Sequence, residues 1–407
     1  MYDFDEIIDR RGTYALNTDG FRSYIFRADE TMKFPYRDEE FIRMWVADME
    51  FAVPDVVLDG IRERLDRKIL GYTRVTGAAY YDAFAGWCRR RYGWDFPQEQ
   101  LVLSNGVIPT LNELVELICA PHEKVLFLTP SYAYFKYAAE FSGRGHVCSD
   151  LICEDGVYRM DFEDLERKAA EEHTALLIFC NPHNPSGRVW KQEELERLGE
   201  IVERNRLWVI SDEIHCDLLR RDQTHLPLGR VMADYDRLVT CMASSKTFNL
   251  AGLMFSNVII RDAALRKRWL RRHHNSDNPL SVAAAQAAYE KGEPWLEELR
   301  VYLDDNFALT KEYLAEHLPR ARFRISEATY LAWVDLSDYF APEEPLPLFF
   351  AYEAGVLLEG GNMFVQNSDG FIRLNLACPR AVLREGLRRI CEAVNNKHGG
   401  LYAGPEA

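Results

Sequence analysis

Short apolar runs that alternate with helical patterns constrain the fold of this 407-residue chain more than any other feature. These runs cover residues 125–128, 175–180, 207–210, 238–242 and 257–260. An amphipathic helical pattern with glutamates on its outer face lies between the second and third runs, from Leu195 to Val202. Alternation of this kind predicts an α/β fold in which helices cover both faces of a mostly parallel sheet. Such sheets bind their ligands at the carboxyl ends of the strands.

The pattern changes after Pro279, which indicates a second, smaller α+β domain. Helical periodicity covers 281–289 and 295–317, strand patterns follow near 323–325, 332–335 and 371–376, and an amphipathic helix closes the chain. A chain of this length with 47% hydrophobic residues can bury the cores of two domains. The expected division is an N-terminal arm over 1–50 that packs with the small domain, a large domain over 51–288, a small C-terminal domain over 289–398 and a frayed tail over 399–407.

Composition and charge argue against several classes of protein. No apolar run approaches the length of a membrane span, and the start of the chain is acidic where a secretory signal would be basic. The nine cysteines are scattered without CxxC or Cys/His metal spacing, which predicts reduced core residues in a cytoplasmic protein and no metal site. A net charge of −15 argues against nucleic acid or an anionic membrane as a partner. The basic stretch 266–274 is interpreted as a solvated helix face, without an assigned function.

Polar motifs follow the apolar runs where the predicted strands end. Ser244, Ser245 and Lys246 come directly after the run 238–242, and this arrangement can hold an amine beside a phosphate, where a carbonyl cofactor is bound as a Schiff base. An exposed Ser-Ser-Lys turn is the ordinary alternative. Asp212 follows another apolar run, and a buried carboxylate there needs a partner such as a cationic pyridinium. Helix capping is the alternative for this residue.

Further motifs have the same placement after predicted strands. The string Asn181-Pro182-His183-Asn184-Pro185-Ser186-Gly187 is a stiff turn that holds Asn184 at a strand end. Tyr132 lies just past another strand, and core packing is the alternative for it. The glycine turn at 104–109 runs into a helix with proline near its start, a construction that points free backbone N–H groups at an anion.

Together these motifs have the order and spacing of a known family. The chain resembles fold-type I pyridoxal-phosphate enzymes of the class I/II aminotransferase superfamily, and within it the MalY/PatB group of cystathionine β-lyases. The resemblance covers nearly the whole chain, from the loop Trp45-Val46-Ala47-Asp48-Met49 to the strand that contains Arg373. The strings 181–187, 211–215 and 245–249 are jointly very specific. The resemblance implies pyridoxal 5′-phosphate as the cofactor, an amino acid substrate, and a homodimer with shared active sites.

The resemblance also implies a role for each matching residue. Lys246 matches the Schiff-base lysine, which moves protons during catalysis, and Asp212 matches the acid beside the pyridine nitrogen. Asn184 matches the side chain that hydrogen-bonds the ring O3′, and Arg373 matches the arginine that clamps the substrate α-carboxylate. Ala47 and Asp48 match residues near the substrate. Tyr132 matches the aromatic residue on the ring face, and His215 stands where many aminotransferases carry a tyrosine near the cofactor. Tyr72 matches a cofactor-binding tyrosine that reaches across the dimer interface. The matches around the phosphate are Gly106, Val107, Ile108, Ser244 and Ser245.

Departures from the family pattern leave the substrate open. Ser186 replaces a threonine, Glu50 an aspartate and Ala377 a glycine, and the segment 358–364 at the expected substrate entrance differs from relatives. Three functions therefore remain: a carbon–sulfur β-lyase acting on L-cystathionine or cysteine conjugates, an amino acid aminotransferase with the same lysine and cofactor, and a regulatory role through binding of another protein. The lyase is the principal expectation, because no stretch matches the second arginine that transaminases often use as a side-chain clamp.

Overall fold

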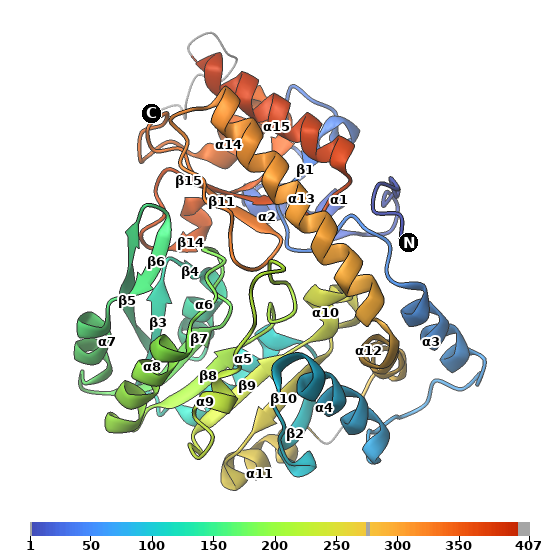
Figure 1. The fold of residues 1–407 in the computed structure, drawn as a ribbon, viewed down its shortest axis with the longest axis vertical. Coiled ribbons are helices and arrows are strands. Elements are labelled where there is room, and N and C mark those ends of the chain that lie inside the picture. Colours follow the sequence, from blue (N-terminus) through green and yellow to red (C-terminus); the bar gives the residue numbers. More distant parts are fainter. Residues whose placement is uncertain (1, 274–276, 398–407) are drawn as a thin grey trace.

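A mixed sheet of eight strands crosses the lower part of the molecule as Figure 1 shows it, below the C-terminal elements. The fold is that of a computed structural model, which describes residues 2–273 and 277–397. Across the sheet the order is β2 (Leu101–Ser104), β10 (Ser256–Ile260), β9 (Leu238–Met242), β8 (Trp208–Asp212), β7 (Thr174–Cys180), β3 (Lys124–Thr129), β5 (Gly145–Glu154) and β6 (Val157–Met160). The predicted tail over 399–407 and the end of the basic stretch, His274, lie outside the described residues.

The sheet is mostly parallel, as predicted. Five adjacent strands run parallel to one another: β9, β8, β7, β3 and β5. The strands on either side of this group pair antiparallel with it, β10 with β9 and β6 with β5. Each apolar run predicted between residues 125 and 260 overlaps one of these strands, and Leu207 alone falls outside, one residue before β8. The α/β class is therefore confirmed, with one internal strand, β10, reversed between β9 and β2.

Helices cover both faces of the sheet because alternate side chains of its strands enter two separate cores. Val125 and Phe127 of β3 join the core that contains residues of α5, α6 and α11. Leu126 and Leu128 of the same strand join the core that contains residues of α7, α8 and α9. The bounds of these helices are Val107–Ile118 for α5, Ala133–Phe141 for α6, Ala263–Arg272 for α11, Phe162–Ala169 for α7, Gln192–Arg204 for α8 and Leu228–Val231 for α9.

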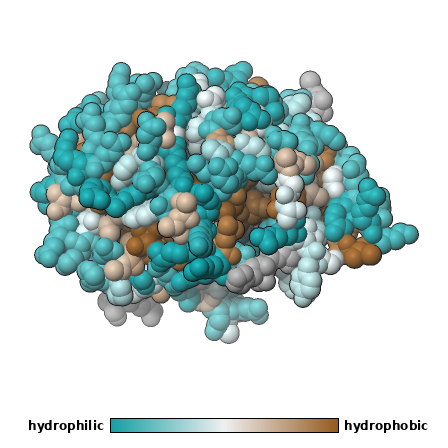
Figure 2. Space-filling view, turned by 90° about the horizontal axis from the view of Figure 1, so that it is seen from below, coloured by the Kyte–Doolittle hydropathy of each residue, from teal (hydrophilic) through white to brown (hydrophobic). Residues whose placement is uncertain are grey.

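A third helical group packs beside β10. It consists of α3 (Asp55–Leu65), α4 (Ala78–Tyr92) and α12 (Pro279–Lys291), which share a core with Ile259 of β10. The aromatic residues Tyr80, Phe84 and Trp87 of α4 are buried in that core. On the face shown in Figure 2 the surface is largely hydrophilic, and apolar side chains gather in a hollow of that face.

The C-terminal part contains a three-stranded antiparallel sheet with β15 between β11 and β13. The predicted strand near 323–325 is wrong. Arg322 forms an isolated bridge to Asp335, and the next side chain, Phe323, packs on Phe307 of the long helix α13, which takes this segment away from the sheet. The elements are α13 (Glu293–His317), β11 (Leu331–Asp335), α14 (Leu346–Glu353), β13 (Glu359–Gly360), β15 (Phe371–Asn375) and α15 (Arg380–Asn395).

The N-terminal segment lies against these C-terminal elements. In Figure 1 its blue helices and strand appear beside the orange and red helices, and β1 pairs in parallel with β12. Phe21 and Trp45 are buried in one cluster with Leu357 of β12. The domain limits at residues 50 and 288 stay a prediction. The bounds are α1 (Leu16–Asp19), α2 (Phe21–Ile25), β1 (Ile42–Arg43) and β12 (Val356–Leu357).

The remaining short elements bring loops to the edge of the large sheet. β4 (Ser131–Tyr132) pairs antiparallel with β14 (Phe364–Val365), and α10 (Ser244–Thr247) directly follows β9. Within residues 2–273 and 277–397, the helices are too short or too polar to cross a membrane.

Candidate active site

A cavity of about 230 Å³ lies where the carboxyl ends of β7, β8 and β9 meet the start of α5. It brings together most of the site residues predicted from the sequence, although they come from segments far apart in the chain. These are Ala47, Gly106, Val107, Ile108, Tyr132, Asn184, Asp212, His215, Ser245, Lys246 and Arg373. Residues without a predicted role also line it, among them Tyr24, Asn105, Phe255 and Glu359. Glu359 belongs to the segment expected at the substrate entrance.

Lys246 faces this cavity from α10. Its Nζ donates a hydrogen bond of 2.6 Å to the carbonyl oxygen of Ala47, which also accepts a bond of 2.8 Å from the Tyr330 hydroxyl. Burial lowers the pKa of the Lys246 amine to about 8, although the nearby Asp48 carboxylate acts in the opposite direction. An amine with this pKa is partly neutral near pH 8, so it can attack a carbonyl carbon or accept a proton.

Asp212 is the last residue of β8, and its side chain is buried. Burial raises the pKa of its carboxyl group to about 7, while a hydrogen bond from the Ile214 backbone N–H at 3.2 Å favours the charged form. Among the described residues, no cation lies within ion-pair distance of it. A buried carboxylate without a cation is costly, so the site has the chemistry to hold a cationic ring nitrogen.

The start of α5 supplies donors for an anion. Gly106 precedes this helix with a φ of 109°, a backbone conformation that side chains rarely adopt. The backbone N–H groups of Val107 and Ile108 open the helix, where no intrahelical acceptor is available, and its first turn contains no acidic residue. Ser245 adds a hydroxyl to the same cavity. A phosphate group suits this combination of a helix N-terminus and a hydroxyl.

The turn after β7 holds Asn184 in a fixed position. Gly187 closes the turn with a φ of 66°, and a Cβ atom there would lie 2.4 Å from Ser326 Cβ. Its backbone N–H donates to the His183 carbonyl oxygen at 2.7 Å, and its carbonyl oxygen accepts from Ala328 at 2.9 Å. The turn is therefore locked against the C-terminal part of the chain.

Arg373 and Glu359 face each other in register on the neighbouring strands β15 and β13. Their side chains form an ion pair with 2.5 Å between Nη2 and Oε2, and only 2% and 5% of them are exposed. Arg373 Nη1 donates to Asn184 Oδ1 at 3.2 Å, and Nη2 donates to the Trp45 carbonyl oxygen at 3.4 Å. The Nε atom of Arg373 has no partner among the described residues. A guanidinium with a free donor suits a ligand carboxylate.

Neutral rings complete the wall of the cavity. Burial raises the pKa values of the Tyr132 and Tyr24 hydroxyls, so both phenols are protonated at neutral pH. Burial lowers the pKa of His215 to about 3, so its imidazole is neutral, and its Nδ1 has no partner among the described residues. Tyr24 comes from α2, so the N-terminal segment contributes directly to the site.

Asp48 does not line the central cavity but supports the loop that does. Arg10 binds Asp48 at 2.6 Å and Glu50 at 2.9 Å. Asn375 of β15 donates to the carbonyl oxygens of Val46 at 2.7 Å and Asp48 at 2.5 Å. These bonds fix the backbone carbonyl of Ala47 that accepts the bond from Lys246.

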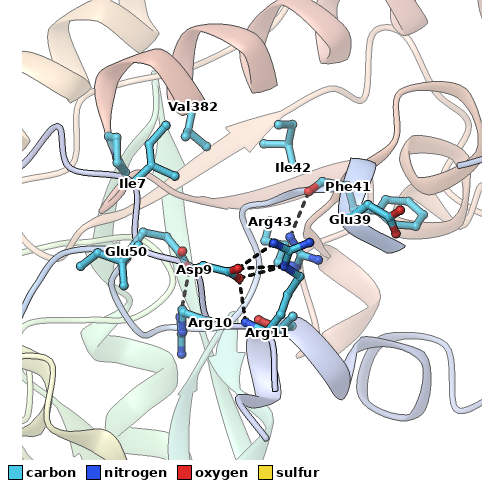
Figure 3. A pocket seen from close by; sticks show the side chains of 13 residues that line it. Ile7, Asp9, Arg10, Arg11, Glu39, Phe41, Ile42, Arg43, Glu50 and Val382 are labelled. Atoms are coloured by element: carbon cyan, nitrogen blue, oxygen red, sulfur yellow. Dashed lines mark hydrogen bonds and ion pairs between the residues drawn. The ribbon is translucent and has the colours of Figure 1, made fainter. Parts of the chain in front are cut away.

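A second cavity, of about 550 Å³, lies on the other side of this loop (Figure 3). Each charged side chain that lines it has at least one partner, although the Nε atom of Arg43 has none among the described residues. Arg10 binds Glu50, Arg11 binds Asp9, and Arg43 donates to the Phe41 carbonyl oxygen at 3.3 Å. We therefore assign this cavity a structural role, the attachment of the N-terminal segment, and place the chemistry in the smaller one.

Two predicted cofactor-binding residues lie away from the central cavity of their own chain. Ser244 is buried beside it, where its carbonyl oxygen accepts from Phe248 N–H at 2.9 Å. Tyr72 is fully exposed, with a relative accessibility of 102%, on the loop between α3 and α4. The site as predicted thus needs Tyr72 to come from another molecule.

The site fits the cofactor that the sequence resemblance implies. Lys246 offers a partly neutral amine, Asp212 a buried carboxylate without a cation, and the start of α5 a set of backbone donors for a phosphate. Arg373 lies across the cavity, where it can hold the carboxylate of an amino acid. Amine, acid, anion site and carboxylate clamp are the groups that a pyridoxal-phosphate enzyme requires.

Comparison with known proteins agrees with this site. The chain is 39% identical to cystathionine beta-lyase PatB of Bacillus subtilis, over 86% of this chain and 92% of that protein. It is 29% identical to protein MalY of Escherichia coli, over 97% of this chain and 99% of that protein. Among solved structures, a PLP-bound C-S lyase from Staphylococcus hominis matches with a TM-score of 0.92 at 50% identity, over 97% and 98% of the two chains.

Two further matches extend the similarity. Cystalysin from Treponema denticola, which contains pyridoxal 5′-phosphate, is similar with a TM-score of 0.90 at 30% identity, over 98% of this chain and all of that one (100%). The family described as aminotransferase class I and II matches residues 40–390, a span that includes the whole central cavity except Tyr24. The chain belongs to the aminotransferase class I and II family, with the fold of type I pyridoxal-phosphate enzymes.

Proposed function

We propose that this protein is a pyridoxal-phosphate-dependent carbon–sulfur β-lyase that cleaves L-cystathionine or related cysteine conjugates to a thiol, pyruvate and ammonia. The observation that carries the proposal is the convergence of Lys246, Asp212 and Arg373 on one cavity. The names of the relatives support the reaction type, since they include a cystathionine beta-lyase at 39% identity and a C-S lyase at 50% identity.

Bound pyridoxal phosphate would supply an electron sink for the pair left at Cα when the substrate loses its α-proton. Lys246 would form the bond to this cofactor and, once the substrate amine has displaced it, would remove that proton. Asp212 would hold the proton on the ring nitrogen, and Asn184, which lines the same cavity, would hydrogen-bond the ring oxygen. Arg373 would orient the substrate through its α-carboxylate.

Elimination then follows from the position of a good leaving group. When the α-proton goes to Lys246, the electron pair of the Cα–H bond becomes available to form a Cα–Cβ double bond as the Cβ–S bond breaks. The sulfur leaves with the pair of that bond and takes up a proton, which Lys246 would supply. The Lys246 amine, neutral again, would then take back its bond to the cofactor and so release the enamine, which tautomerises and reacts with water to give pyruvate and ammonia.

The cavity favours elimination over transamination. Among the described residues that line it, the cationic side chains are Lys246 and Arg373, and Lys246 is needed for the chemistry. A transaminase that accepts a dicarboxylic oxo acid needs a further cation for the distal carboxylate. This cavity offers an acid, Glu359, instead.

A direct competition tests the reaction type. The purified holoenzyme receives L-cystathionine together with either 2-oxoglutarate or the monocarboxylic 2-oxobutanoate, and pyruvate plus free thiol are measured against the amino acid newly formed from the oxo acid. We expect pyruvate and thiol to exceed that amino acid by at least about tenfold with either oxo acid. Dominant formation of amino acid with several sulfur substrates would identify an aminotransferase instead.

We also infer that the protein acts as a cytoplasmic homodimer with shared active sites. Support comes from an exposed group of apolar side chains, Leu70 at 55%, Tyr72 at 102% and Met254 at 57% exposure. A surface cavity of about 770 Å³ between them is lined by Asn105 and Met254, which also line the central cavity. A tyrosine from a second copy that enters there would approach the start of α5.

The cysteines support the proposed cytoplasmic location. All nine are free thiols, which suits a reducing compartment.

Complementation in mixed dimers tests the shared site. Lys246→Ala and Tyr72→Ala proteins are each expected to be nearly inactive, whereas their coexpression produces some dimers with one intact site and one site that carries both changes. Partial recovery of activity is the expected result. Two Lys246→Ala proteins with different tags are the control and should recover nothing. An active monomer at assay concentration would contradict the shared site.

A further inference from the structure

The arginine expected to bind the substrate carboxylate already faces a carboxylate of its own chain. Glu359 pairs with Arg373 at 2.5 Å, and both side chains are almost completely buried. The backbone next to Glu359 cannot shift easily. A Cβ atom on Gly360 would lie 2.6 Å from Pro347 Cδ, and one on Gly361 would lie 1.6 Å from the Ser368 carbonyl oxygen. The carboxylate of Glu359 is therefore a fixed part of the site.

Glu359 determines the charge on the substrate side of the cavity. The groups that face it are Arg373 from β15, Lys246 from α10, Tyr24 from α2 and Tyr132 from β4. Both tyrosines are neutral, as described above. Asp212, the other acid in the cavity, would face the cofactor ring. In the proposed holoenzyme the Lys246 amine would be bonded to the cofactor, so the count on this side starts from the neutral pair of Arg373 and Glu359. One incoming carboxylate then leaves this side with one negative charge, and a second carboxylate leaves it with two.

We propose that Glu359 is a specificity-determining residue that admits amino acids with one carboxylate and rejects those with a second carboxylate on the side chain. This inference rests on the proposed function, in which Arg373 binds the α-carboxylate. The like charge of Glu359 in a buried site repels the additional carboxylate, since little solvent is present to screen it. L-Cystathionine escapes this penalty because its distal end carries an ammonium as well as a carboxylate. Glu359 thus favours sulfur amino acids over aspartate, glutamate and their oxo acids.

Two unreactive acids of equal length separate charge from size. Pentanoate has one carboxylate and pentanedioate has two, and neither has an amine that could react with the cofactor. Their dissociation constants for the holoenzyme are measured at pH 8 from competition with L-cystathionine and from the change in cofactor absorbance. We expect pentanedioate to bind at least about tenfold more weakly than pentanoate. Equal dissociation constants would overturn the role of Glu359. Failure of both acids to bind would instead contradict the carboxylate site at Arg373, and with it the proposed function.

Glu359→Gln keeps the length of the side chain and removes its charge. The ratio of the two dissociation constants is expected to fall toward one, mainly because pentanedioate binds more tightly. Glu327→Gln is the matched control, because Glu327 pairs with the buried Arg188 at 2.8 Å outside the cavity. That variant should keep the wild-type ratio. If Glu359→Gln raises the dissociation constants of both acids by the same factor, Glu359 only holds Arg373 in place and the proposal is wrong. Glu359→Met, also of similar length and uncharged, carries the test if Glu359→Gln loses the cofactor.

Discussion

The two walls of the central cavity hold their buried carboxylates differently. On the wall built by the large sheet, Asp212 has no cation within ion-pair distance among the described residues, and burial raises its pKa to about 7. On the wall built by the C-terminal sheet, Glu359 also has a raised pKa but pairs with Arg373 at 2.5 Å. The carboxylate of the first wall therefore needs a cation from a ligand. On the second wall Arg373 already neutralises Glu359, so a ligand carboxylate must share the guanidinium of Arg373 with Glu359.

The largest effect is expected at Lys246, on the wall built by the large sheet. Lys246→Ala removes both the attachment point of the cofactor and the base, so elimination from L-cystathionine should fall by at least about 10⁴-fold. The absorbance of the bound cofactor should change as well. Lys267→Ala, at an exposed position on α11, is the control and should keep full activity. Substantial residual activity in Lys246→Ala would remove the basis for the proposed reaction.

Asp212→Asn tests whether the first wall lacks a cation. Activity should fall by about 10³-fold, because a neutral amide cannot keep the ring nitrogen protonated.

The stability of the cofactor-free Asp212→Asn protein should change in the opposite direction. The pKa in the folded state, about 7, is above the ordinary value of 3.8, so the stabilising contribution of this group is present at low pH and is lost as pH rises through 7. At pH 8 the variant should therefore melt about 3 °C higher than the wild type in differential scanning fluorimetry. A lower melting temperature would indicate that Asp212 already has an effective partner.

Arg373→Ala tests whether the second wall is self-sufficient. The variant leaves Glu359 buried without a cation, so the free energy of unfolding should fall by about 3 kcal/mol. The value of kcat/KM for L-cystathionine should fall by about 10²-fold. Urea denaturation of Arg373→Ala combined with Glu359→Gln should recover much of the lost stability but little of the lost activity. If the double variant is no more stable than the single one, the two side chains are not coupled.

The smallest effect concerns the pH at which the cofactor attaches. The attacking amine must be neutral, and the pKa of Lys246 is about 8, so the rate of attachment should rise about tenfold per pH unit below 8 and level off above it. Asp48 raises this pKa, so Asp48→Asn should move the midpoint to lower pH. Stopped-flow absorbance of the cofactor-free protein mixed with pyridoxal phosphate measures both midpoints. An unchanged midpoint would show that the Asp48 charge does not reach the amine.

The wall built by the large sheet could be predicted from the sequence, and the other wall could not be predicted in full. Buried parallel strands appear as continuous apolar runs, and the functional residues of that wall lie at the end of a run or a few residues after it. Asp212 is the last residue of β8, and Lys246 follows β9 after a short turn. Glu359 has no such signal. It lies in a strand of two residues, and its pairing with Arg373 depends on the register of β13 against β15, which spacing in the chain does not show.

Two further features, a hairpin and a cavity residue, are hard to predict from the sequence, for reasons that lie in short segments of the chain. The hairpin of β5 and β6 has no clear sequence signal in its strands, because a polar residue, Ser149, occupies a buried position of β5 and an apolar one, Ile152, an exposed position, so apolar residues do not alternate along this strand. Its turn, Asp155-Gly156, was an available signal, since both residues have a positive φ and Asp-Gly is typical of two-residue hairpin turns. Tyr24 reaches the cavity from a helix of five residues, too short for periodicity to reveal.

The bond between Lys246 and the Ala47 carbonyl has a consequence for the order of events during synthesis. Ala47 leaves the ribosome well before Tyr330 and Asn375, the two residues that hold its loop. Contacts so distant in sequence form late in folding. A nascent chain that already contains Lys246 therefore lacks the surroundings that lower the pKa of its amine. The pKa of the Lys246 amine falls to about 8 only after these segments have joined the site, so preferential reaction of this lysine with an aldehyde waits for that late step of folding.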